Sequence, residues 1–307
     1  MRSAIVTLAL SPLASSVVFS KPRRLVHSTW LTHIPFAMYL VDVLRPKVIV
    51  ELGTYAGASY CAFCQAVQIL GIEARCYAID TWQGDPQSGL YGAHVLADLR
   101  SHHDALYGDF SRLFQCSFDD ALSTFNDASI DLLHIDGLHT YEAVRHDFES
   151  WFPKLSAHGV VLFHDIAVHE DDFGAWRYWA EIKERYPSFE VQYGCGLGVL
   201  AVGSMAKDPL AELLNATPEE RASMEQFFGS LGRRWELEHE LKALKWVAKQ
   251  QAETLAWFQE ELADYQKLRR LPLVRFLRAW SRYGVMGAGT RALGRVWSRM
   301  RGVQPES

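Results

Sequence analysis

The feature that most constrains the fold is an alternation of strand-like and helix-like segments between Val48 and Gly203. The strand-like segments are short, apolar and rich in β-branched residues, which is typical of strands buried on both faces of a sheet. This alternation predicts an α/β fold in which helices cover a mostly parallel sheet. The expected strands are residues 47–52, 74–80, 111–118, 130–137, 159–165, 189–194 and 197–203.

The last two expected strands are joined by a short connection that contains glycine. A parallel pair needs a crossover of about a dozen residues or more, so segments 189–194 and 197–203 are predicted to run antiparallel. The expected helices are residues 57–70, 119–127, 140–155 and 173–187.

Acidic residues stand at the ends of four expected strands, and the carboxyl ends of parallel strands meet at one edge of a sheet. These residues are Glu51, Asp80, Asp136 and Asp165, the last preceded by His164. Four acids at neighbouring strand ends would repel one another in a fold that binds nothing there. We therefore predict a ligand site at this edge.

The turn after the first strand, in VIVELGTYAG at residues 48–57, narrows the class of ligand. Gly53 and Gly57 lack the G-x-G-x-x-G spacing of dinucleotide-binding turns, and no phosphate-loop lysine follows them. Glu51 before this turn favours a ligand with a cationic amine. Asp80 ends the next strand, where a carboxylate bonds ribose hydroxyls in nucleotide-binding folds. A ribose joined to an amino-acid cation describes S-adenosylmethionine.

Five segments, among them CYAIDTWQGD and GVVLFHD, carry a resemblance to a known family. The chain resembles class I S-adenosylmethionine-dependent methyltransferases, of the bacterial type associated with cell-surface sugar and polysaccharide biosynthesis. The resemblance implies a Rossmann-like, seven-stranded, mostly parallel sheet with an antiparallel last strand, in a cofactor-binding domain at residues 30–205. It also implies O-methylation of a saccharide or glycan precursor. The segments are residues 30–60, 76–85, 131–155, 159–165 and 196–203.

The resemblance also implies which residues hold S-adenosylmethionine. Asp80 is expected at the ribose with Trp82 beside it, Ser117 and Phe118 at the adenine, and Asp136 next to the cofactor. The residues expected at the methionine end are Glu51, Gly53, Thr54, Gly57 and Ser59.

Methyl transfer requires an acceptor in line with the methyl group, and a base when the acceptor is a hydroxyl. His139, His164 and Asp165 are the candidate catalytic residues, with either histidine as the base. His134 lies inside an expected buried strand and is predicted to be a core histidine with satisfied hydrogen bonds. His146 is expected on a solvated helix face.

A second hypothesis assigns a metal to the same strand ends. Some related O-methyltransferases hold magnesium with three such groups, which correspond here to Asp136, His164 and Asp165. His164 replaces an acid of those relatives, and histidine suits transition metals better than magnesium. The sequence leaves two hypotheses open, a divalent ion or a histidine base oriented by Asp165.

Two other functions stay open from the sequence. Some relatives on the same fold are associated with hydroxylase systems instead of methyl transfer. A non-catalytic alternative treats the chain as a coiled-coil scaffold that carries a relic of the sheet domain.

The region after the sheet changes character. Residues 206–232 contain Pro and Gly among short helical patterns and are expected to be a connector. Residues 233–268 have a heptad register and predict a helix that pairs as a coiled coil in a homo-oligomer, or packs within one chain. Its heptad positions are Leu237, Leu241, Leu244, Ala248, Gln251, Leu255, Phe258, Leu262 and Tyr265.

Residues 269–307 form a basic tail with interleaved Leu, Trp and Phe, for which peripheral membrane contact, an acidic partner or disorder are the alternatives. From Tyr265 onward there are ten Lys or Arg and one acid, although the whole chain carries a net charge of -5. The rest of the chain is therefore acidic, and we expect no nucleic-acid partner.

The remaining expectations concern the N-terminus and the cysteines. Residues 1–29 are expected to be an N-terminal extension of a cytoplasmic protein, because Pro12 interrupts an apolar run that otherwise resembles a signal peptide. No membrane-spanning helix is expected. Cys61 and Cys64 lie in a helical pattern and are predicted to be small buried residues.

Overall fold

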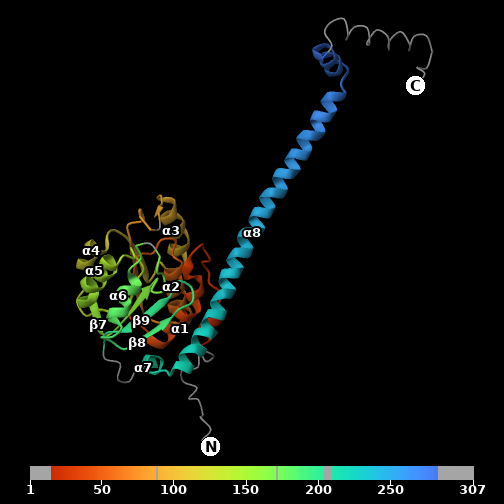
Figure 1. Ribbon diagram of the computed structural model, residues 1–307. Helices are drawn as coiled ribbons and strands as arrows, with labels where there is room; N and C mark the ends of the chain where they lie inside the picture. Colours follow the sequence, from red (N-terminus) through yellow and green to blue (C-terminus); the bar gives the residue numbers. More distant parts are fainter. Residues whose placement is uncertain (1–14, 88, 171, 204–208, 283–307) are drawn as a thin grey trace, which may run out of the picture. The chain divides into compact units, whose positions relative to one another are not determined.

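A computed structural model describes residues 15–87, 89–170, 172–203 and 209–282 (Figure 1). The chain divides into two compact units, Met1–Glu240 and Leu241–Ser307. The apolar run expected at residues 1–14 and the larger part of the basic tail, residues 283–307, lie outside the described residues.

The first unit is built on a seven-stranded sheet with the order β5-β2-β1-β6-β7-β9-β8. Strand β9 runs antiparallel to both of its neighbours, β7 and β8, and the strand pairs from β5 to β7 are parallel. The expected mixed sheet is therefore confirmed. Its strands are β1 (Val48–Leu52), β2 (Arg75–Asp80), β5 (Ser111–Gln115), β6 (Ile130–Ile135), β7 (Leu155–His164), β8 (Ser188–Val191) and β9 (Leu197–Ala201).

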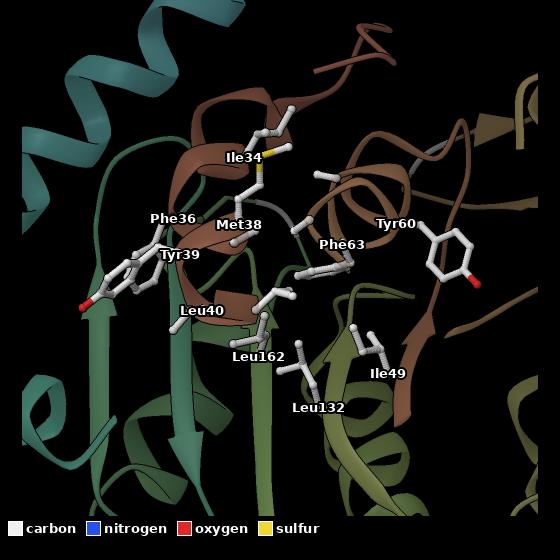
Figure 2. Packing of buried hydrophobic residues seen from close by; sticks show 14 of the residues in the cluster. Ile34, Phe36, Met38, Tyr39, Leu40, Ile49, Tyr60, Phe63, Leu132 and Leu162 are labelled. Atoms are coloured by element: carbon white, nitrogen blue, oxygen red, sulfur yellow. The ribbon is translucent and has the colours of Figure 1, made fainter. Parts of the chain in front are cut away.

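Helices cover both faces of this sheet (Figure 1). Alternate residues of a buried strand point to opposite faces, so β1, β2, β6, β7 and β9 each contribute to two apolar clusters. In one cluster Ile49, Leu132 and Leu162 point from the sheet toward Met38 and Phe63 (Figure 2). The described helices that precede α8 are α1 (Ile34–Leu44), α2 (Ala58–Leu70), α3 (His94–Tyr107), α4 (Phe118–Ala121), α5 (Tyr141–Trp151), α6 (Ala175–Ile182) and α7 (Pro209–Leu214).

Short elements complete the first unit. Strands β3 (Gly84–Asp85) and β4 (Gly89–Leu90) pair as a small antiparallel ribbon. The 3-10 turns are η3 (Ser16–Phe19), η4 (Thr29–His33), η5 (Leu122–Thr124) and η6 (Phe152–Lys154).

Several element boundaries differ from the sequence expectation. Helix α5 ends at Trp151 and strand β7 begins at Leu155, because Pro153 lies in the turn η6 and cannot continue the helix ladder. Strand β5 ends at Gln115, and the Ser117 side chain accepts the Asp120 amide N–H as the cap of α4.

Helix α8 (Pro218–Arg270) begins inside segment 206–232, where the sequence predicted a connector. A Cβ on Gly232 would lie 1.8 Å from the Thr32 carbonyl oxygen, so only glycine allows this close approach. Phe228 is completely buried, with its ring centroid 5.1 Å from that of Phe36. Gly232, which resembles a helix breaker, is therefore a packing position of the first unit.

The segment expected as an N-terminal extension also packs into this unit where it is described. Val17 and Val18 are buried. Arg24 is buried and donates to the Ala56 carbonyl and to Asp98. These contacts attach the segment to the sheet domain before the predicted boundary at residue 30.

The described part of the second unit is helical. Helix α8 continues to Arg270, and residues 272–282 are also helical. Among the described residues, no helix is both long enough and apolar enough to cross a membrane.

Candidate functional site

The glycine turn after β1 lies directly on the end of β6. Gly53 has a φ of +85°, and its amide N–H donates to the Ile79 carbonyl at 2.9 Å. A Cβ at this position would lie 2.1 Å from the Asp136 carbonyl oxygen. Both the backbone conformation and the contact require glycine, and together they bring the turn next to Asp136.

Asp80 organises the same turn. Its Oδ2 accepts the backbone N–H groups of Thr54 at 2.9 Å and Tyr55 at 2.8 Å. Its Oδ1 accepts the N–H of Trp82 at 2.6 Å. The Tyr91 side chain also hydrogen-bonds this carboxylate, so a ligand hydroxyl would share or replace one of its four contacts.

The N-terminus of α2 completes the turn. Gly57 precedes the helix with a φ of +78°, and a Cβ there would lie 2.5 Å from Leu99 Cδ1. Ser59 is buried in the first turn of α2. Thr54 Oγ1 is buried and has no hydrogen-bond partner among the described residues, so it can receive one from a ligand.

Ser117 and Phe118 follow the end of strand β5, which pairs with β2. The Ser117 hydroxyl is engaged with Asp120, from which it accepts the amide N–H at 3.1 Å and to whose carboxylate it donates at 2.6 Å. The Phe118 ring covers Gly137, where a Cβ would lie 2.6 Å from the ring. An aromatic ring therefore borders the loop that follows β6.

Glu51 finds its partner inside the protein. His134 Nδ1 lies 2.9 Å from Glu51 Oε2, and both side chains are completely buried. The Trp30 indole N–H donates to His134 Nε2 at 3.2 Å, so the tautomer of His134 carries its proton on Nδ1. His134 is thus a core histidine with both nitrogens bonded, as predicted.

Glu51 nevertheless retains one open acceptor. Oε1 is buried and has no hydrogen-bond partner among the described residues. Burial raises the pKa of Glu51, and the hydrogen bond from His134 only partly opposes this. A donor on a ligand would satisfy the second oxygen.

Asp136, His139, His164 and Asp165 form one compact cluster, which we call the tetrad. His139 Nε2 lies 2.9 Å from Asp165 Oδ2 and 3.3 Å from Asp136 Oδ1. His164 Nδ1 lies 2.9 Å from Asp136 Oδ1 and 3.3 Å from Asp165 Oδ1. One potential ligand atom from each residue lies within 4.8 Å of the others, so each imidazole is shared by both carboxylates.

This sharing shifts all four pKa values toward the charged forms. Burial opposes the charge on both histidines, but the two carboxylates outweigh it and raise the pKa of His139 to about 9 and that of His164 to about 10. Burial likewise opposes ionisation of Asp136 and Asp165, yet the imidazoles hold both pKa values below their usual range.

The tetrad is anchored by its backbone. Asp165 has a φ of 59°, a left-handed conformation that costs a non-glycine residue roughly 1–2 kcal/mol. The His139 N–H donates to Gln87 Oε1 at 2.8 Å, and its carbonyl accepts the Gly174 N–H at 2.7 Å. The His139 ring stacks on Phe173 at 5.3 Å, so it cannot turn freely.

Three residues that the sequence did not single out lie behind the tetrad. Trp30 bonds His134, and the buried His33 ring lies 5.4 Å from that of His164. Tyr193 stacks on His33 at 5.1 Å. No local pattern identifies these residues, because their partners are far away in the chain.

The observed topology is that of a Rossmann-like α/β domain, with clustered acidic and imidazole side chains at the carboxyl edge of its sheet. Residues 50–166 match the model of a family described as a methyltransferase domain. This part of the chain, which holds the glycine turn and the tetrad, is therefore similar to methyltransferases.

One curated relative is the uncharacterized protein y4gI of Sinorhizobium fredii (strain NBRC 101917 / NGR234). It is 49% identical over 187 residues, which cover 61% of this chain and 20% of the relative. The chain thus spans about a fifth of that protein's length.

Solved structures of methyltransferases resemble the fold at low identity. The O-methyltransferase TomG of Streptomyces achromogenes, in complex with S-adenosylmethionine, is 15% identical, with 59% of this chain and 83% of TomG covered and a TM-score of 0.45. The methyltransferase PaMTH1 of Podospora anserina, bound to S-adenosylhomocysteine, is 16% identical, with coverages of 55% and 77% and a TM-score of 0.43.

Proposed function

We propose that this protein is an S-adenosylmethionine-dependent O-methyltransferase. One observation carries the proposal: the Gly53 turn packs on the Asp136 backbone, which puts a turn suited to the cofactor beside the tetrad. Residues 50–166, which match a methyltransferase domain, include both the Gly53 turn and the tetrad.

The buried polar groups suit the two ends of the cofactor. The Asp80 carboxylate suits a ribose hydroxyl that shares or replaces the Tyr91 contact. Glu51 Oε1 and Thr54 Oγ1 lack partners among the described residues and suit the cationic amino-acid end. The Phe118 ring offers an apolar face for the adenine.

His139 is the proposed base that receives the proton of the acceptor hydroxyl. Its side chain is 15% exposed, whereas that of His164 is 2% exposed, so His139 is the more accessible imidazole. Asp136 and Asp165 orient it. Because the pKa of His139 is raised to about 9, its proton must leave before catalysis, and the positive sulfonium of a bound cofactor favours this loss.

The tetrad also fits a divalent metal ion. Two carboxylates and two imidazoles suit a transition metal better than magnesium, which prefers oxygen ligands. Asp136, His139, His164 and Asp165 would hold the ion, and it would polarise the acceptor hydroxyl. The imidazole protons would have to leave for binding to occur.

The acceptor is proposed to be a saccharide or glycan precursor. This part of the proposal rests on the resemblance of the sequence segments to methyltransferases of sugar biosynthesis. It is therefore separable from the proposal of methyl transfer itself.

Cofactor binding tests the first part. We expect Asp80→Ala to bind S-adenosylhomocysteine about ten- to a hundredfold more weakly by calorimetry, because ribose hydroxyls and the Thr54 and Tyr55 amides lose an acceptor. The control is Asp119→Ala, an exposed acid that pairs with exposed His146. Equal affinities for Asp80→Ala and the wild-type protein would remove Asp80 from the cofactor site.

Methyl transfer tests the second part. Protein is incubated with methyl-labelled S-adenosylmethionine and cell-envelope glycolipid extract, before and after exhaustive chelation. Loss of transfer with intact cofactor binding identifies a required metal, and full activity after chelation leaves His139 as the base. Absence of cofactor binding in the wild-type protein would overturn the proposed function.

A further inference from the structure

The described part of the second unit carries an exposed apolar stripe. We define the α8 seam as the heptad residues in this unit. Large seam side chains are about half exposed or more, for example Leu244 at 67% and Leu255 at 61%. Isolated surface leucines are ordinary, but a continuous stripe at spacings of three and four is typical of a helix that pairs. The seam residues are Leu241, Leu244, Ala248, Gln251, Leu255, Phe258, Leu262 and Tyr265.

We propose that the α8 seam binds the α8 seam of a second copy of this chain, with the two helices parallel and in register. The seam runs over about 36 Å of helix at 1.5 Å per residue, long enough for several interlocking layers. The seam positions alternate spacings of three and four, the register of a coiled-coil seam, and the exposed Trp246, Val247 and Trp257 lie outside it.

The charges beside the seam favour the parallel orientation. Glu240 immediately precedes the seam and Lys245 flanks Leu244 on the other side of the stripe. In a parallel, in-register pair, Glu240 of each copy faces Lys245 of the other, which gives two attractive contacts. In an antiparallel pair with the same overlap, Lys245 would face the uncharged Gln259 instead.

The polar seam position favours the same orientation. In a parallel pair Gln251 meets Gln251 of the second copy, so the two amides can hydrogen-bond across the seam. In the antiparallel pair Gln251 would lie against Leu255 and leave its amide in an apolar layer. A polar residue at one seam position is a known means of fixing register and partner number.

Oxidative cross-linking of the full chain distinguishes the orientations. Leu241→Cys and Tyr265→Cys are prepared separately, with Glu253→Cys on the opposite helix face as the matched control and wild type to report background from the five natural cysteines. In a parallel pair each seam variant cross-links with itself, and Glu253→Cys does not. Cross-links that form only in a mixture of Leu241→Cys and Tyr265→Cys would overturn the proposal in favour of an antiparallel pair.

Light scattering across micromolar concentrations tests association itself. We expect a dimer for wild type and for Glu253→Lys, and at least about a hundredfold weaker association for Leu255→Lys, since each copy loses a buried leucine. Circular dichroism checks that Leu255→Lys retains its fold. The cross-linking experiment does not use this variant, so its result is independent of that check. A wild-type protein that stays monomeric across this range would overturn the proposal. Its seam would then pack within one chain or bind a membrane surface, and sedimentation with anionic vesicles tells these two apart.

Discussion

Two acid–histidine groups lie at the same edge of the sheet and behave in opposite ways. Glu51 has a single imidazole partner, His134, and burial raises its pKa. Asp136 has two imidazole partners, and its pKa lies well below the usual range although burial opposes this. Two imidazoles in contact and a third, His134 Nε2 at 4.0 Å, outweigh burial at Asp136, whereas the one imidazole beside Glu51 does not.

The two groups also differ in how far they are exposed to a ligand. The Glu51–His134 pair is completely buried, and the second nitrogen of His134, Nε2, accepts the Trp30 indole N–H. The tetrad includes the partly accessible side chains of Asp136 and His139. A ligand can reach the tetrad without dismantling the core, whereas the buried Glu51 Oε1 becomes available only if the groups around it move.

Removal of the shared carboxylate should have the largest effect. Asp136→Asn deprives both His139 and His164 of a charged partner, so we expect methyl transfer to fall by roughly a thousandfold, within the range for a group that supports general base catalysis. Labelled transfer measures the rate, with Asp119→Asn as control. Activity within about tenfold of wild type would show that the tetrad does not act on the acceptor.

Replacement of His134, the imidazole of the Glu51–His134 pair, should lower the free energy of unfolding. His134→Phe keeps much of the ring volume but leaves the Glu51 carboxylate buried without its partner and Trp30 without an acceptor. We expect a loss of roughly 3–5 kcal/mol in the free energy of unfolding, measured with urea. His146→Phe, an exposed control, should change little, and an equally stable His134→Phe would contradict the assigned role of the pair.

The sequence predicted more of the sheet than of what surrounds it. Strand alternation and strand-end acids are local signals, so the carboxyl edge followed from β/α topology, and the grouping of Asp136, His164 and Asp165 followed from the resemblance to related O-methyltransferases. His33 and Trp30 were missed because their contacts are long-range; Trp30 and His134 are 104 residues apart. No periodicity encodes such a contact.

Glycines and charged residues misled for a related reason. Gly232 resembles a helix breaker, yet helix α8 uses it to approach the Thr32 backbone. Asp147 follows His146 on what the sequence indicated as a solvated face, but Asp147 is only 6% exposed while His146 is solvated as expected. The role of Gly232 and the burial of Asp147 both depend on the surface that each residue packs against, and the local sequence does not contain that surface.

Asp147 extends the comparison to a buried acid with no imidazole hydrogen bond. Burial raises its pKa from 3.8 to about 7. Between those pH values the folded state holds a proton that the unfolded chain has released, so stability falls as pH rises from about 4 to about 7. Asp147→Asn does not titrate, and above pH 7 it should be more stable than wild type by roughly 2–4 kcal/mol.

Urea unfolding at pH 4 and pH 8 measures this difference. The gap between Asp147→Asn and wild type should open only at the higher pH, whereas Asp119→Asn, whose acid is exposed, should show no such opening. A gap of the same size at both pH values would mean that Asp147 is ionised in the fold.

The smallest expected effect is at Glu51, where charge and hydrogen bonding can be separated. Glu51→Gln retains an oxygen that accepts from His134 Nδ1 but removes the charge that burial disfavours. We expect the free energy of unfolding at pH 8 to stay within about 1 kcal/mol of wild type or to rise, because the pKa of Glu51 is raised in the fold. Affinity for S-adenosylhomocysteine should fall about tenfold, since the ligand's ammonium group loses a charged acceptor. Calorimetry and urea unfolding on the same preparation separate the two effects, and unchanged affinity would make Glu51 a purely structural partner of His134.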